Sequence, residues 1–236
     1  MRRSTRSIVL VHGAWHGSWC WTRVVPLLEQ RGFLVHAVDL PSTGIGPPSG
    51  VDLSADAAAV RAAIDASSGE VLVCGHSYGG MVISHPAVGT HPRLAHLAYL
   101  CAFLPERAES LFAIGDGRPA PWIRVDERGL SLPDLDQAPA LLYGDCDPET
   151  QSWAVGRLRP QPTGPFTEPV ADPAWRYTPS TYIVCTQDCV MPLELQRGLF
   201  ASRTAGLIEL EASHSPFLSR PGELAQALAA LAPCAS

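Results

Sequence analysis

The chain has 236 residues, of which 17 are Lys or Arg and 23 are Asp or Glu, so its formal net charge is −6. This length is within the usual range for one domain with a substantial hydrophobic core. The sequence contains no basic cluster and no run near the ~18 apolar residues of a membrane span, which argues against nucleic acid and membranes as partners.

The N-terminus combines a basic tip with a short apolar run. Residues 1–15 read MRRSTRSIVLVHGAW, which is superficially like a secretory signal. The apolar run, residues 8–11, is only four residues long and leads into His12 and Gly13 without a cleavage-like stretch. We therefore expect a disordered tip that leads into a buried strand.

Short apolar runs then alternate with helix-compatible segments. The strand-like runs are SIVLVH (7–12), FLVHAV (33–38), EVLVCG (70–75), LAHLAYLC (94–101), STYIVC (180–185) and GLIELEA (206–212). The helix-compatible segments are 21–31, 53–66, 78–90, 193–204 and 221–232. Near-continuous apolar runs separated by helices are typical of a mostly parallel sheet covered on both faces. The pattern predicts one α/β domain over 1–236, with its core in 1–104 and 176–236.

The segment 105–175 breaks this alternation and predicts a cap over the site. It is rich in Pro and Gly, and its stretch LRPQPTGPFTEP excludes a regular helix or a central strand. It also holds Trp122, Trp153 and Trp175, which favour a packed element over the alternative, a disordered linker.

The strongest local motif is GHSYGG at 75–80, which matches G-x-S-x-G. It directly follows the apolar run EVLVC and directly precedes a helix-compatible segment, which is the strand-turn-helix setting of a nucleophile elbow. The motif predicts Ser77 as a nucleophile on a strained turn where only glycine neighbours leave room. The alternative is a glycine-rich turn with an idle serine.

A serine hydroxyl needs a base, and the base needs a group that fixes its tautomer. His214 directly follows the last strand-like run, and it is the only histidine after residue 96. Asp188 follows the run that ends at 185, so both side chains fall where strands should end. Asp172 in the Pro-rich segment and Glu194 inside a predicted helix are the competing acids. The order Ser, Asp, His favours Asp188 as the acid.

Acyl transfer also needs donors for the developing oxyanion. We expect one from the backbone N–H of Tyr78, which follows the nucleophile. The second should be the N–H of Ala14 in the turn after the first strand, where Gly13 permits close approach. An ordinary turn is the alternative for this segment. His12 and His76 are interpreted as structural.

The seven cysteines contain no CxxC pair. Cys74, Cys101 and Cys185 fall in or at the ends of strand-like runs, which suits reduced thiols in a core and makes the cytoplasm the default location. No Cys and His cluster has zinc spacing, so we predict no metal and no other cofactor.

The motifs LVHGAWHGSWCW, GHSYGGMV, YIVCTQDCVMP and ASHSPFLSRP together resemble the small α/β hydrolases, which include plant methylesterases of the salicylate-binding type and hydroxynitrile lyases. The resemblance implies an α/β-hydrolase fold with a small cap after the sixth strand. It implies a triad of Ser77, Asp188 and His214 with oxyanion donors at Ala14 and Tyr78.

Two positions separate the branches of this family. Hydroxynitrile lyases are similar but carry Thr and Lys where this chain has Gly13 and Ser215. Without that lysine no cation would stabilise a leaving cyanide, so the resemblance favours an esterase.

The sequence therefore predicts a serine hydrolase that cleaves a small, fairly apolar ester, as a monomer or a homodimer. Two alternatives remain: a biosynthetic enzyme that uses the same triad for cyclisation, elimination or acyl transfer, and a ligand-binding receptor. The predicted pocket walls are Gly13, Phe103, Leu104, Trp122, Trp153 and Met191.

Overall fold

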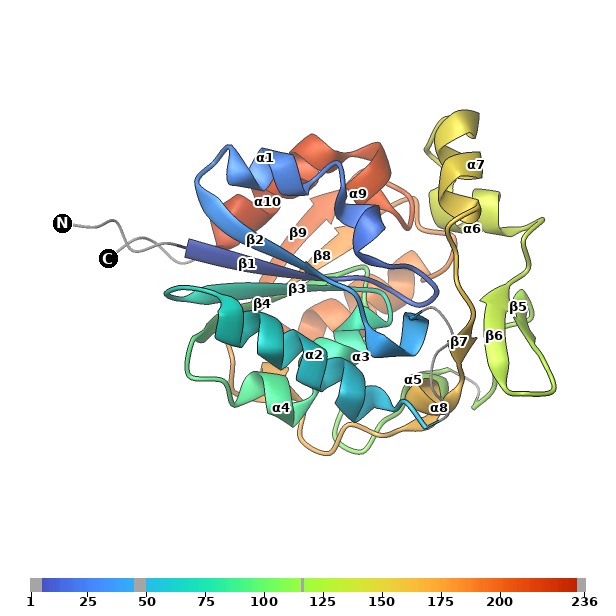
Figure 1. Ribbon diagram of the computed structural model, residues 1–236, viewed down its shortest axis with the longest axis horizontal. Helices are drawn as coiled ribbons and strands as arrows, with labels where there is room; N and C mark the ends of the chain where they lie inside the picture. The colour runs from blue at the N-terminus through green and yellow to red at the C-terminus, as the bar shows by residue number, and fades with distance from the viewer. Residues whose placement is uncertain (1–5, 45–49, 116, 233–236) are drawn as a thin grey trace.

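A six-stranded, fully parallel sheet forms the centre of the fold (Figure 1). The structure is a computed structural model that describes residues 6–44, 50–115 and 117–232. The strands are β1 (Arg6–Val11), β2 (Phe33–Val38), β3 (Val71–His76), β4 (Leu94–Leu100), β8 (Ser180–Cys185) and β9 (Gly206–Leu210), in the order β2-β1-β3-β4-β8-β9. All six predicted runs are thus strands of one sheet. The predicted tip, residues 1–5, lies outside the described residues.

Alternate side chains of the strands enter two hydrophobic cores, one on each face of the sheet. In β1, Val9 and Val11 join the core beneath one group of helices, and Ile8 and Leu10 join the core beneath the other. Figure 1 shows the two groups on opposite sides of the sheet. The groups are α2 (Leu53–Ala66), α3 (Gly79–Ser84) and α4 (Pro86–Gly89), and α1 (Val25–Glu29), α9 (Pro216–Ser219) and α10 (Pro221–Leu231). Burial on both faces explains why the strands read as nearly continuous apolar runs.

Three of the predicted helices are shorter or less regular than expected. The helix predicted over 78–90 divides at His85, whose backbone is extended (ψ 139°) because the following Pro86 disfavours helical geometry there. The segment 21–31 holds only α1, after a 3₁₀ turn η1 (Ser18–Trp21). The segment 193–204 forms a π-helical turn η4 (Leu195–Phe200) and a 3₁₀ turn η5 (Ala201–Arg203).

The chain between β4 and β8 forms a separate layer over one end of the sheet, at the right in Figure 1. Three short strands make a small antiparallel sheet in the order β5-β6-β7. The elements are α5 (Leu111–Ile114), β5 (Ile123–Val125), β6 (Leu130–Pro133), α6 (Ala138–Tyr143), α7 (Pro148–Val155), β7 (Gln161–Pro162), α8 (Gly164–Thr167) and η3 (Ala174–Arg176). The proline-rich stretch supplies only the two-residue edge strand β7 and the four-residue helix α8, which suits residues that cannot donate to a ladder or a helix interior. We call residues 105–175 the cap.

One expected detail of the topology is wrong. The cap follows the fourth strand of the central sheet and not the sixth, because the chain before residue 94 supplies only β1, β2 and β3 to that sheet within the described residues.

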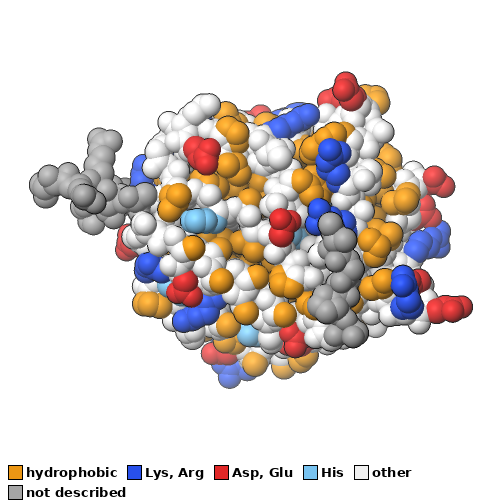
Figure 2. All heavy atoms as spheres, viewed as in Figure 1, with side chains coloured by type: hydrophobic (Ala, Val, Ile, Leu, Met, Phe, Trp, Pro, Cys, Tyr) orange, Lys and Arg blue, Asp and Glu red, His pale blue; other side chains and the backbone are white. Residues whose placement is uncertain are grey.

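Charged side chains lie on the surface, and three cysteine thiols lie in the core. Acidic and basic side chains are interspersed on the face in Figure 2. No helix within the described residues is long and apolar enough to cross a membrane. Cys74, Cys101 and Cys185 are buried free thiols, as predicted, and Cys234 lies outside the described residues.

Candidate active site

Ser77 occupies a strained turn between β3 and α3. Its φ of 51° lies in the left-handed region, which a residue with a side chain rarely adopts. Its N–H donates to the carbonyl of Leu100 at 3.2 Å, so the turn is tied to the neighbouring strand β4. A β-carbon on Gly75 would lie 2.6 Å from the carbonyl oxygen of Gly79, so only glycine lets strand and helix approach this closely. The turn therefore holds the serine side chain at the carboxyl end of a central strand.

His214 and Asp188 form a buried hydrogen-bonded pair. The His214 Nδ1–H donates to Asp188 Oδ2 at 2.7 Å, and the two side chains are 2% and 0% exposed. Asp188 Oδ1 accepts the N–H groups of Val190 and Met191 at 2.7 and 3.0 Å, which fix the carboxylate. Because Nδ1 carries the proton, Nε2 of His214 keeps a lone pair. His214 and Ser77 line the same pocket.

The competing acid Asp172 lies elsewhere. It pairs with Arg107 at 2.6 Å on the surface of the cap, whereas Asp188 alone of the three candidate acids binds His214 within the described residues.

Two neutral histidines hold the turn that follows β1. His12 Nδ1–H donates to the carbonyl of Gly13 at 2.8 Å, and His12 Nε2 accepts the Leu40 N–H at 3.1 Å. His16 Nδ1–H donates to the carbonyl of Ala14 at 2.7 Å. Desolvation by burial lowers the pKa of His12 to about 4 and that of His16 to about 3, so each ring keeps one donor and one acceptor.

This arrangement leaves the Ala14 N–H of the turn without a described partner. In a trans peptide the C=O and N–H point in opposite directions, so the bond from His12 to the Gly13 carbonyl directs the Ala14 N–H the other way. Neither the Ala14 N–H nor the Tyr78 N–H donates to any described protein atom. Both residues line the pocket beside Ser77. Two backbone N–H donors beside Ser77 are thus free.

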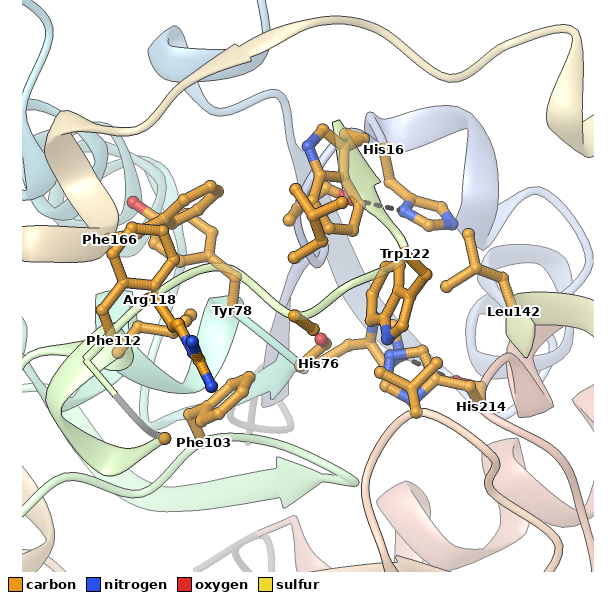
Figure 3. Close-up of a pocket in the computed structure, with 18 residues that line it drawn as sticks. His16, His76, Tyr78, Phe103, Phe112, Arg118, Trp122, Leu142, Phe166 and His214 are labelled. Atoms are coloured by element: carbon orange, nitrogen blue, oxygen red, sulfur yellow. Dashed lines mark hydrogen bonds between the residues drawn. The ribbon is translucent and has the colours of Figure 1, made fainter. Parts of the chain in front are cut away.

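The pocket itself is small and largely apolar. It measures about 150 Å³, and Figure 3 shows how side chains of the sheet end and the cap surround it. Among the described residues that line it, Arg118 is the one with a permanent charge. The aromatic and aliphatic lining residues include Trp15, Phe103, Leu111, Phe112, Trp122, Ile123, Leu142, Phe166 and Val190. Such a lining suits a small molecule with an apolar body.

Comparison with known proteins identifies the family of this chain. Residues 8–227 match the model of a family described as the alpha/beta hydrolase family. The chain belongs to the alpha/beta hydrolase family. The family resemblance seen in the four motifs and the predicted fold class are confirmed.

Individual relatives cover nearly the whole of this alpha/beta hydrolase. It is 34% identical to a pyrethroid hydrolase of Sphingobium wenxiniae, over 94% of this chain and 86% of that one. It is 28% identical to methylesterase 1 of Arabidopsis thaliana, over 92% of both chains. The crystal structure of a pyrethroid hydrolase from Sphingobium faniae matches with a TM-score of 0.83 and 30% identity, over 96% of this chain and 97% of that one.

Two of the predicted wall residues of this alpha/beta hydrolase, Phe103 and Trp122, line the pocket. The prediction for Trp153 is wrong, because it does not line the pocket and its ring packs edge-on against Trp19 of η1 at 5.3 Å. Leu104 also does not line the pocket, and its buried side chain belongs to the hydrophobic core.

Met191 and Gly13, the other two predicted wall residues, also do not line the pocket. Met191 is buried, and its sulfur accepts the hydroxyl of Tyr182 at 3.4 Å, so it belongs to the core. Gly13 does not line the pocket but makes the close approach expected of it. A β-carbon there would lie 2.7 Å from His76 Nδ1 and 2.9 Å from the Ser77 β-carbon.

Sequence reasoning missed Phe112, Phe166 and Arg118 as wall residues. All three lie in the cap and belong to no motif, so only their aromatic or charged character hinted at a role. It also missed His16, whose bond to Ala14 orders the turn.

His76, Cys101 and His214 bring potential metal-ligand atoms within 4.8 Å of one another. One nitrogen of each histidine is engaged otherwise, whereas His76 Nδ1 has no hydrogen-bond partner among the described residues. His76 Nε2–H donates to the His214 carbonyl at 2.8 Å, and Asp188 holds His214 Nδ1. Burial raises the pKa of the Cys101 thiol well above its ordinary value, so the sulfur stays protonated. The cluster therefore supports the His214 loop, as the structural interpretation of His76 anticipates.

Proposed function

We propose that the protein is a serine hydrolase that cleaves a small, fairly apolar ester, with Ser77, His214 and Asp188 as its triad. The observation that carries the proposal is the convergence of three features in one pocket: the strained Ser77, the His214 held by Asp188, and the free N–H groups of Ala14 and Tyr78. The relatives named as hydrolase and methylesterase support cleavage of an ester bond.

The reaction follows from these positions. His214 Nε2 takes the proton of the Ser77 hydroxyl as Oγ attacks the ester carbonyl. The N–H groups of Ala14 and Tyr78 stabilise the negative charge on the carbonyl oxygen. His214 then protonates the leaving alcohol, and water later releases the acyl group by the same path. Asp188 stays ionised and holds the imidazolium in place.

The branch position Gly13 argues against the lyase chemistry of similar proteins. A β-carbon at Gly13 would collide with His76 and Ser77, so threonine is not compatible with this turn. Ser215, at the other branch position, is buried and uncharged. The pocket therefore offers no lysine to stabilise a leaving cyanide, and hydrolysis of an ester is the reaction that the site supports best.

The cellular setting follows from the thiols. Three buried free cysteines fit a reducing compartment, so we propose the cytoplasm as the location. The apolar pocket fits a small molecule as the partner.

The test is hydrolysis of p-nitrophenyl butyrate together with labelling by a fluorophosphonate probe. We expect the wild type to turn over and to be labelled, and Ser77→Ala to lose both, with kcat lower by about 10⁵ or more. Ser202→Ala is the matched control, because this exposed hydroxyl binds only a nearby backbone carbonyl.

The other outcomes separate the alternatives. Labelling of Ser77 without turnover of any simple ester would point to a biosynthetic enzyme or a receptor on this scaffold. A wild type that is neither labelled nor active would refute Ser77 as the nucleophile.

A further inference from the structure

A buried chain of polar side chains connects Tyr78 to the cap. The Tyr78 hydroxyl donates to Asp56 Oδ2 at 2.6 Å, and the Ser42 hydroxyl donates to the same oxygen at 2.6 Å. Ser42 Oγ in turn accepts Gln161 Nε2–H at 2.8 Å, and Gln161 Oε1 accepts the Trp15 N–H at 3.0 Å. Asp56, Ser42 and Gln161 are fully buried. Unsatisfied polar groups at such depth would be strongly unfavourable, so the chain has one stable arrangement.

The direction of every bond in the chain is fixed by chemistry. The Trp15 N–H can only donate, so the Gln161 oxygen must face it and the Gln161 NH₂ must face Ser42. The Ser42 hydroxyl then has its proton free for Asp56, which also accepts the Ser42 N–H at 3.0 Å. Three donors on one carboxylate define it as an acceptor in this network.

Both ends of the chain lie at the candidate oxyanion donors. Tyr78 itself carries one of the free N–H groups, and Trp15 directly follows Ala14, which carries the other. The peptide unit between Ala14 and Trp15 is held from both sides, with its carbonyl bound by His16 and its N–H bound by Gln161. Trp15 has a φ of 62°, which a non-glycine residue adopts only where its surroundings hold it.

Gln161 reaches this turn from the cap, 146 residues farther along the chain. It lies in strand β7, and its own carbonyl accepts the hydroxyl of Ser131 in β6 at 2.8 Å. Ser131 Oγ also accepts the indole N–H of Trp15 at 3.0 Å. Trp15 is thus bound through both its backbone and its side chain by the small cap sheet.

We propose that Gln161 is a positioning residue through which the cap fixes the oxyanion-binding turn, so that the cap sets the rate of acyl transfer as well as the shape of the pocket. This inference rests on the proposed function. It assigns to a buried glutamine, far from the nucleophile in sequence, control over the direction of the Ala14 N–H.

The experiment compares Gln161→Met with Gln151→Met. Methionine keeps the length of the side chain and removes the amide. Gln151 is the matched cap glutamine, because its amide binds only the cap carbonyls of Tyr143 and Cys146. For Gln161→Met we expect kcat for p-nitrophenyl butyrate to fall about tenfold to a hundredfold, with KM within about twofold, since a misplaced donor acts on the transition state. Gln151→Met should keep the wild-type kcat.

The inhibition constant of an alkyl trifluoromethyl ketone distinguishes a positioning role of Gln161 from a merely structural one. Ser77 Oγ adds to its carbonyl carbon, the hydroxyl proton passes to His214, and the resulting alkoxide occupies the oxyanion position. The inhibition constant of this ketone should rise in Gln161→Met by about the same factor as kcat falls. The inhibition constant of the parent alcohol, which carries no oxyanion, should stay the same.

If Gln161→Met does not fold, Ser42→Ala carries the test, because it removes the hydroxyl that fixes the amide orientation of Gln161. A smaller fall in kcat, about threefold to tenfold, with a matching rise in the ketone inhibition constant is expected. Unchanged kcat and ketone affinity in a folded Gln161→Met or Ser42→Ala, in a wild type that hydrolyses esters, would overturn the inference and leave the proposed function standing. A wild type without turnover and labelling would overturn both.

Discussion

Replacement of Gly13 by alanine tests whether the turn after β1 positions an oxyanion donor. The added β-carbon would lie 2.7 Å from His76 Nδ1 and 2.9 Å from the Ser77 β-carbon, both closer than van der Waals contact. Neither neighbour can easily give way. His76 is fully buried and its Nε2 is bonded to the His214 carbonyl at 2.8 Å, and Ser77 is held in a strained turn. The backbone of Gly13 must therefore move, and the Ala14 N–H moves with it.

The size of the effect follows from these contacts. Overpacking of a rigid site reduces the free energy of unfolding by about 1 to 3 kcal/mol. Displacement of one oxyanion donor lowers kcat by about a hundredfold. We therefore expect Gly13→Ala to fold, to show a lower urea midpoint, and to lose most of its kcat with little change in KM.

The assay combines urea unfolding with steady-state hydrolysis of p-nitrophenyl butyrate. Gly222→Ala in α10 is the control, because no described atom beyond its chain neighbours and its own helix backbone lies within 4 Å of the added β-carbon. That variant should keep its activity, and its stability should stay the same or rise slightly, as alanine favours helix. A Gly13→Ala protein with wild-type kcat would refute the role of this turn in catalysis.

Three further predictions concern the acid, the pocket charge and the buried histidines. Asp188→Asn should lower kcat by about 10⁴, because the amide holds the wrong tautomer of His214; wild-type kcat would exclude this acid. Arg118→Met should lower kcat/KM about tenfold for an ester with a terminal carboxylate and leave its neutral methyl analogue unchanged, since Arg118 is the permanently charged lining residue; an equal loss for both would contradict the prediction. Burial lowers the pKa of His12 to about 4 and of His16 to about 3, so the unfolded chain binds protons more strongly than the folded one below about pH 6.5. The urea midpoint should therefore decrease as the pH is lowered from about 6.5 to about 4. A midpoint that stays constant over this range would contradict the burial of His12 and His16 as neutral rings.

The elements that could be predicted from the sequence are those whose determinants are local. The elbow around Ser77 occupies six consecutive residues after an apolar strand. Each of its glycines is required because a β-carbon there would collide with atoms of the turn or of the segments beside it. His214 and Asp188 follow strands directly, so the sheet alone brings them to one end of the molecule. The break before Pro86 also has a local cause in a single residue, yet the prediction of one helical segment over 78–90 missed it.

The pocket walls could not be predicted in the same way. Trp153 and Phe166 are both aromatic residues of the cap, yet one packs on Trp19 outside the pocket and the other lines it. That difference depends on how the cap folds over the sheet. The proline-rich sequence of the cap has no periodic pattern that would predict which side chains face the pocket. The bond from Gln161 to Trp15 belongs to the same class, since 146 residues separate its partners.

The proposed oxyanion-binding turn depends both on local sequence and on contacts from the cap, and this links substrate preference to rate. Phe112 and Phe166 of the cap shape the pocket, and Gln161 of the same cap binds the turn beside Ala14. A change in the cap that widens the pocket therefore also disturbs the Ala14–Trp15 peptide, which directly follows the Ala14 N–H, unless the bonds of Gln161 and Ser131 to Trp15 are preserved. Variants of Phe166 that keep these two bonds should alter substrate preference at nearly constant kcat for small esters, whereas changes in β6 or β7 should lower kcat for every ester alike.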